Sequence, residues 1–134
     1  MKLSILQVPY DSGRFDQRMG SGPLLLTDLG LVNWLKTEGY DVQLTEVRLP
    51  DEFMSEVGAS KYIHCQIKRI AEVNLREGYL PLILAGNCNY AAFGTLAALQ
   101  NLKTGIIWLD AHGDFNTPET INVPIMLYGP FSKR

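Results

Sequence analysis

TGIIWLDAHGDFNT, residues 104–117, is the segment that decides the fold and the expected chemistry of this chain. Its apolar run, residues 106–109, is typical of a short strand buried on both faces of a sheet. Asp110, His112 and Asp114 follow at every second position. Because alternate residues of an extended chain point to the same side, these three potential metal ligands share one face. The segment therefore predicts a metal site past the carboxyl end of a buried strand, where ligand crevices form in open α/β sheets.

The spacing of these ligands also predicts a curled backbone. A straight segment would separate Asp110 from Asp114 by roughly 13 Å, at about 3.3 Å per residue, which is too far for both to bind one ion. Gly113 lies between them and permits the chain to curl. Two carboxylates and one imidazole suit a divalent ion of the Mn, Mg or Zn kind, either alone or as a pair bridged by a shared carboxylate.

A second apolar run, LPLILA, lies upstream at residues 80–85. We expect it to form another strand buried on both faces, which ends at the polar loop Gly86-Asn87-Cys88-Asn89. A helix of small residues is then expected from Tyr90 to about Gln100, and its alanines and glycine allow it to lie close to the sheet. Two polar loops thus follow two buried strands at their carboxyl ends.

The first half of the chain contributes two further strands. Residues 2–8 predict the first, and residues 41–49 predict a strand at a sheet edge because they alternate apolar and polar positions. Residues 10–23 form a Gly-rich loop that places Pro23 at the first position of a helix. Within this loop, Gly20-Ser21-Gly22 lacks the lysine and spacing of a phosphate-binding loop and predicts a plain strand-to-helix turn.

Two helices complete the predicted pattern. Residues 24–38 predict one that ends at Gly39, and residues 60–77 predict another with Ser60 as N-cap and Gly78 as terminator. His64 in the second helix is expected to be a surface or half-buried side chain. The inner faces are assigned to Leu25, Leu29, Val32 and Leu35 in the first helix and to Ile63, Ile67, Ile70 and Ala71 in the second.

Strands that alternate with helices predict an α/β fold, a three-layer sandwich with a mostly parallel sheet. A length of 134 residues corresponds to a single domain, and a net charge of −2 with scattered basic residues argues against nucleic acid as a partner. We find no apolar run of the roughly 20 residues that a membrane span needs, and no signal peptide, so we expect a cytoplasmic protein. Cys65 and Cys88 are expected to be free thiols.

Three segments together resemble the arginase/agmatinase/formimidoylglutamase family of ureohydrolases: Gly20–Pro23, Gly86-Asn87-Cys88-Asn89, and residues 110–116 with their Asp-Ala-His-Gly-Asp motif. The likeness extends from the first strand to about Thr120. Members of this family use a binuclear manganese centre to activate a hydroxide, which attacks the amidine carbon of a guanidino or formimino group. The resemblance implies an arginase-like α/β domain over residues 1–134 and a small-molecule amidine as substrate.

The resemblance also implies roles for individual residues. Asp110 matches the carboxylate that bridges the two ions, and His112 and Asp114 match ligands of the individual ions. Asn116 matches a position that contacts the amino-acid end of the substrate. Cys88 matches the family's first histidine ligand, but a thiolate is a soft ligand that favours zinc over manganese. No catalytic side chain is assigned, because the nucleophile is expected to be the metal-bound hydroxide.

The same resemblance raises a second hypothesis. Family members are about twice this length and supply two further aspartates from a late Asp-x-Asp motif, so the domain is expected to be truncated before that motif. Two divalent ions held by Asp110 and Asp114 alone leave excess positive charge, which is unfavourable to bury. We therefore expect this chain by itself to be weakly active or inactive. The alternative to a metal-dependent hydrolase is a non-catalytic relative that forms homo-oligomers or pairs with a full-length homologue.

Overall fold

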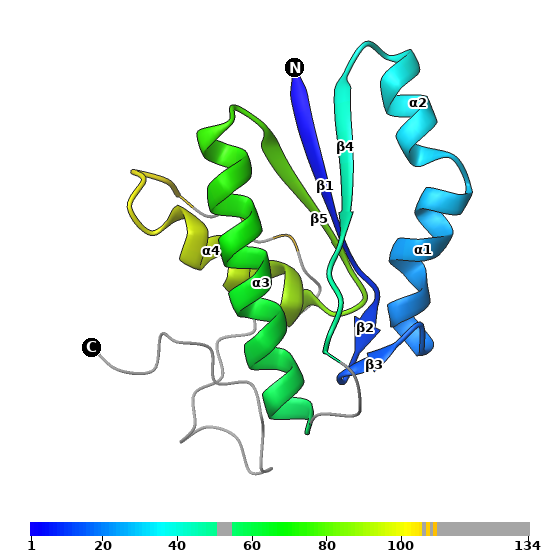
Figure 1. The fold of residues 1–134 in the computed structure, drawn as a ribbon, viewed down its shortest axis with the longest axis vertical. Coiled ribbons are helices and arrows are strands. Elements are labelled where there is room, and N and C mark those ends of the chain that lie inside the picture. Colours follow the sequence, from blue (N-terminus) through cyan, green and yellow to red (C-terminus); the bar gives the residue numbers. More distant parts are fainter. Residues whose placement is uncertain (51–54, 106, 108, 110–134) are drawn as a thin grey trace.

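The computed structural model describes residues 1–50, 55–105, 107 and 109 (Figure 1). Its main sheet contains three parallel strands in the order β4-β1-β5, formed by Lys2–Val8 (β1), Asp41–Glu46 (β4) and Leu80–Ala85 (β5). The α-helices in this part of the chain are Ser21–Asp28 (α1), Leu31–Thr37 (α2), Glu56–Arg76 (α3) and Cys88–Leu99 (α4). A hairpin of Tyr10–Asp11 (β2) and Arg14–Phe15 (β3), followed by the 3-10 turn Arg18–Gly20, connects β1 to α1.

Helices cover both faces of the sheet, with α1 and α2 on one side and α3 and α4 on the other (Figure 1). The prediction of an α/β sandwich with a mostly parallel sheet is confirmed. Two groups of buried side chains fill the layers because apolar residues of the strands face the helices on each side. The group beneath α2 contains Leu3, Ile5, Leu35 and Val42, and the group beneath α3 and α4 contains Leu6, Val8, Tyr10, Val47, Ile63, Ile67 and Tyr90.

The central strand β1 is buried on both faces, which forces its polar side chains to find partners. Ser4 is fully buried, and its hydroxyl oxygen accepts a hydrogen bond from Nδ2 of Asn74 at 2.6 Å. The Oδ1 atom of the same asparagine accepts one from Nε2 of Gln43 at 2.9 Å. Since buried polar groups are costly when unpaired, this arrangement stabilises the contact of α3 with two neighbouring strands.

The prediction of a single helix over residues 24–38 is wrong. It is divided into α1 and α2 because Gly30 adopts a φ of 95°, a left-handed conformation that glycine tolerates and that interrupts a helix. The predicted inner face is interrupted with it, so that Leu35 is buried whereas Leu29 is 76% exposed. Helix α1 also begins at Ser21, two residues before the expected Pro23. Gly39, with a φ of 85°, follows α2 as predicted.

Helix α3 begins earlier than predicted. Its N-cap is Ser55, whose hydroxyl accepts a hydrogen bond from the backbone N–H of Gly58 at 3.2 Å, so the assignment of Ser60 as N-cap is wrong. The inner stripe is correct for Ile63, Ile67 and Ala71, which are fully buried, while Ile70 is only partly buried. No helix among residues 1–50 and 55–105 is long and apolar enough to cross a bilayer.

The two strands expected to be buried on both faces differ from the prediction. In β5, Leu80 and Leu82 are exposed because α2, which lies on that side of the sheet, packs against β4 at the opposite edge. Of the strand predicted at residues 106–109, the structure describes only Ile107 and Leu109, which have no regular secondary structure and are 88% and 92% exposed; residues 106 and 108 lie outside the described residues. An apolar run forms a buried strand only where neighbouring strands and helices cover it.

Helix α4 has the small residues that the sequence predicts, and one of them, Gly94, lies against α3. A Cβ atom added at Gly94 would lie 2.7 Å from Cβ of Ile67 and 2.9 Å from the carbonyl oxygen of His64, both in α3. The absence of a side chain at this position therefore permits α3 and α4 to pack in close contact.

Candidate functional site

The loops that follow β1 and β5 meet at the carboxyl edge of the sheet. The backbone N–H of Gly86, directly after β5, donates to the carbonyl oxygen of Val8 at 3.3 Å. Gly86 also lies against the 3-10 turn, since a Cβ atom added there would be 2.5 Å from Cα of Gly20. The sheet thus brings two of the three segments with a family resemblance, Gly20–Pro23 and the Gly86-Asn87-Cys88-Asn89 loop, into direct contact.

Cys88 is the first residue of α4 and is exposed at this edge. The side chain of Asn87 caps the helix by accepting a hydrogen bond from the backbone N–H of Asn89 at 3.0 Å. Sγ of Cys88 lies 3.9 Å from Oδ1 of Asn87. The prediction of free thiols is confirmed for both Cys88 and Cys65.

The other predicted ligands, Asp110, His112 and Asp114, and the predicted substrate contact Asn116 lie outside the described residues. Their roles stay predictions. Within residues 1–50, 55–105, 107 and 109, no group of three or more His, Cys, Asp or Glu side chains is arranged to hold a metal ion. Cys88 is therefore the one predicted site residue whose position the structure gives.

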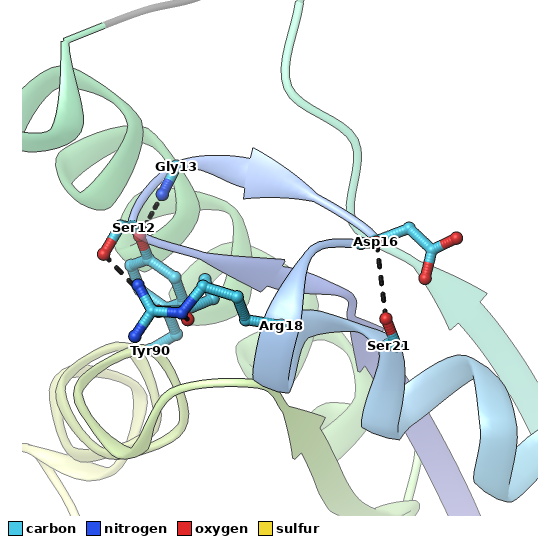
Figure 2. Close-up of polar contacts among 7 residues, drawn as sticks. Ser12, Gly13, Asp16, Arg18, Ser21 and Tyr90 are labelled. Atoms are coloured by element: carbon cyan, nitrogen blue, oxygen red, sulfur yellow. Dashed lines mark hydrogen bonds and ion pairs between the residues drawn. The ribbon is translucent and has the colours of Figure 1, made fainter.

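Tyr90 is an important residue that the sequence did not single out. It is buried in the first turns of α4, and its hydroxyl accepts a hydrogen bond from the backbone N–H of Gly13 at 2.9 Å (Figure 2). Desolvation by burial raises the pKa of this hydroxyl; the Gly13 N–H opposes the shift, and the carboxylates of Glu56 and Asp11 add to it. The neutral hydroxyl thus joins the β2–β3 hairpin to α4 across 77 residues of sequence.

We expect Tyr90→Phe to lower the free energy of unfolding by about 2 kcal/mol, because the substitution leaves the buried N–H of Gly13 without an acceptor. Urea denaturation followed by circular dichroism measures the change. Tyr62→Phe is the matched control, since Tyr62 is half-buried in α3 and its hydroxyl makes no hydrogen bond to the described residues. Equal stability of the two variants would contradict the assigned role of the Tyr90 hydroxyl.

His64 is half-buried between α3 and α4, as predicted. Its ring contacts those of Tyr90 and Phe93 edge-on, with centroid distances of 6.0 Å and 5.6 Å, and Nε2 lies 3.2 Å from the carbonyl oxygen of Asn89. Burial lowers the pKa of His64, although the contacts with Asn89 oppose the shift. A neutral ring that donates from Nε2 to this carbonyl fits the surroundings, so His64 supports the packing of α4.

The fold and this edge first define a class, the open parallel α/β sandwiches that carry ligand sites beyond the carboxyl ends of their strands. The sequence model of the Arginase family matches residues 1–128. This chain belongs to the arginase family.

The relatives agree with that assignment. The chain is 33% identical over 132 residues to the arginase of Bacillus caldovelox and 32% identical over 127 residues to that of Bacillus subtilis. In each comparison 88% of this chain is covered but only 43% of the relative, so the chain spans less than half the length of these arginases. The crystal structure of arginase from Bacillus cereus superposes with a TM-score of 0.74 and 27% identity, over 91% of this chain and 43% of that one.

Proposed function

We propose that this chain carries part of a ureohydrolase site and contributes to hydrolysis of a C–N bond in a linear amidine of the arginine, agmatine or formimidoylglutamate type. The observation that carries the proposal is the Asp110-His112-Asp114 motif in a chain that belongs to the arginase family. The motif follows the apolar residues 106–109, and it comes after a loop that the structure places at the carboxyl edge of the sheet.

The donor atoms decide which metal fits. Carboxylate oxygens and imidazole nitrogen from Asp110, His112 and Asp114 suit manganese, whereas the thiol of Cys88 does not. We therefore assign manganese to the first three side chains and leave Cys88 beside the site as a residue that weakens the first metal position. Manganese, when bound, lowers the pKa of water and so supplies a hydroxide nucleophile near neutral pH.

The protein's own groups have positioning roles in this proposal. Asn116 orients the substrate by hydrogen bonds to its amino-acid end, and the amide suits this role because it both donates and accepts. The loop that contains Cys88 forms one wall, held by the contact of Gly86 with Gly20. The substrate is a small molecule, and a second copy of the chain or a longer relative completes the assembly.

Stoichiometric manganese binding tests the assignment. We expect purified protein dialysed against MnCl2 to retain manganese, measured by inductively coupled plasma mass spectrometry, and Asp110→Ala and Asp114→Ala to lose it because each removes a charged ligand. Asp28→Ala is the control, since Asp28 is an exposed carboxylate of α1 that makes no ion pair with the described residues. Cys88→His is expected to increase manganese affinity by about tenfold or more, because it supplies a harder ligand.

The contrary outcomes are specific. Protein without manganese, or manganese that persists in Asp110→Ala and Asp114→Ala, would show that these side chains do not form the site. A metal-free protein that co-purifies with a longer relative would instead support a non-catalytic binding role. Because the chain by itself is expected to be weakly active or inactive, ready release of urea or formamide from arginine, agmatine or formimidoylglutamate would contradict that expectation, and the amidine that reacts would identify the substrate type.

A further inference from the structure

A buried carboxylate beside the candidate site has an exposed partner. The side chain of Asp11, in β2, is only 7% exposed, and its Oδ2 atom lies 3.3 Å from Nε of Arg18, whose side chain is 77% exposed. Oδ2 accepts no hydrogen bond from the described residues, so the contact is an ion pair. An uncompensated buried carboxylate is unfavourable, so the attraction of Asp11 stabilises the position of the Arg18 guanidinium.

The backbone between these two residues is strained. Ser12, Asp16 and Arg18 adopt φ values of 49°, 50° and 50°, in the left-handed region that L-residues other than glycine avoid. Such conformations persist where surrounding contacts hold them. Figure 2 shows the Ser21 hydroxyl donating to the carbonyl oxygen of Asp16, a contact that holds the same turn. Arg18 therefore combines a left-handed backbone conformation with an ion pair to a buried carboxylate.

The turn that Arg18 begins continues directly to the candidate site. It ends at Gly20, and Gly20 packs against Gly86 so closely that no Cβ atom fits between them. Gly86 lies two residues before Cys88, the first residue of α4. Arg18 and Gly20 thus belong to one short turn, whose end contacts the residue that precedes Asn87 and Cys88.

We propose that Asp11 and Arg18 are positioning residues whose ion pair holds the turn Arg18–Gly20 against Gly86 and thereby fixes the loop that contains Cys88. The consequence for hydrolysis rests on the proposed function. The effect on the Cys88 thiol does not, because it requires neither metal nor substrate. The pair acts through the backbone contact and touches no reacting atom.

The reactivity of the Cys88 thiol tests the proposal. In a Cys65→Ser background, where Cys88 is the remaining cysteine, Ellman's reagent reports its rate of modification. We expect Arg18→Gln and Asp11→Asn each to change this rate by about fivefold, equivalent to about 1 kcal/mol for an ion pair of this exposure. Arg18→Lys is expected to restore most of the original rate because it keeps the charge. Arg69→Gln, at an exposed arginine of α3, is the control and should leave the rate unchanged.

A double-mutant cycle separates the pair from a general loss of structure. If the ion pair is responsible, Asp11→Asn combined with Arg18→Gln has the same effect as either substitution alone, whereas independent effects multiply. Multiplied effects, or unchanged rates in both single variants, would overturn the proposal. Altered Cys88 rates in a protein that binds no manganese leave the ion-pair inference standing and remove the proposed function. Manganese binding together with unchanged rates of Cys88 modification would support the proposed function and overturn the ion-pair inference.

Discussion

Gly94→Ala is expected to lower the free energy of unfolding by about 3 kcal/mol, the upper end of the usual cost of overpacking a core. The added Cβ atom would lie 2.7 Å from Cβ of Ile67, 2.8 Å from its Cγ2 and 2.9 Å from the carbonyl oxygen of His64. Ile67 is fully buried, so it has no free space to move into. The contact must be relieved by separating α4 from α3, which removes apolar surface from the core on that side of the sheet.

Gly22→Ala is the matched control for this substitution. Gly22 lies in α1, and a Cβ atom added there meets nothing within 4 Å. Gly22 lies in the first turn and precedes Pro23, whose ring disfavours a helical residue with a Cβ atom before it, so the helix preference of alanine is offset and this variant is expected to change the free energy of unfolding by less than about 1 kcal/mol. Urea denaturation of both variants gives the difference. A Gly94→Ala protein as stable as the original would show that the helices adapt without cost and that the close packing of α3 and α4 is unimportant.

The sheet was predictable because it depends on local patterns. The apolar residues of 2–8 and 80–85 and the alternation in 41–49 each favour strands, and helical segments between them require parallel pairing. The pairing of β1 with β4 and with β5 is parallel, as predicted. The helix ends at Gly39 and Gly78 were predictable for the same reason, since both adopt the positive φ that favours glycine there.

The errors occur where the residue preferences permit more than one local structure. Gly30 divides the predicted helix because it adopts a left-handed conformation, although a glycine is tolerated within a helical pattern. Ser55 precedes α3 as N-cap, although Ser60 satisfies the same residue preference. The sequence alone offers two acceptable caps, and only the packed structure selects one.

The sequence predicted part of the candidate site and missed the contacts that support it. Residues 86–89 lie at the carboxyl edge as their position after an apolar run indicated, but α4 begins at Cys88, two residues earlier than predicted, so Cys88 and Asn89 are helical. The ion pair between Asp11 and Arg18 was not foreseen, because it depends on positive φ values at residues other than glycine. The Tyr90 contact with Gly13 connects residues far apart in sequence, so no periodic pattern indicates it.

Gly86→Ala is expected to lower the free energy of unfolding by about 3 kcal/mol and to move the candidate site as well. The added Cβ atom would lie 2.5 Å from Cα of Gly20, 2.6 Å from its backbone N and 2.7 Å from the carbonyl carbon of Met19. All three are backbone atoms, so no side-chain rotation relieves the contact. Either the 3-10 turn moves away from the sheet, or the loop that contains Cys88 moves away from the turn.

Gly105→Ala is the control, since a Cβ atom added at Gly105 meets nothing within 4 Å and both glycines lie outside regular elements. Urea denaturation measures stability, and the Ellman's reaction of Cys88 in the Cys65→Ser background reports the loop. Because Gly86→Ala acts at the end of the proposed chain of contacts, adding Arg18→Gln should change the Cys88 rate little further. If Arg18→Gln changed the Cys88 rate by the same factor in the Gly86→Ala protein as in the original, the ion pair would affect Cys88 without the contact between Gly20 and Gly86. That backbone contact would then not couple the two loops.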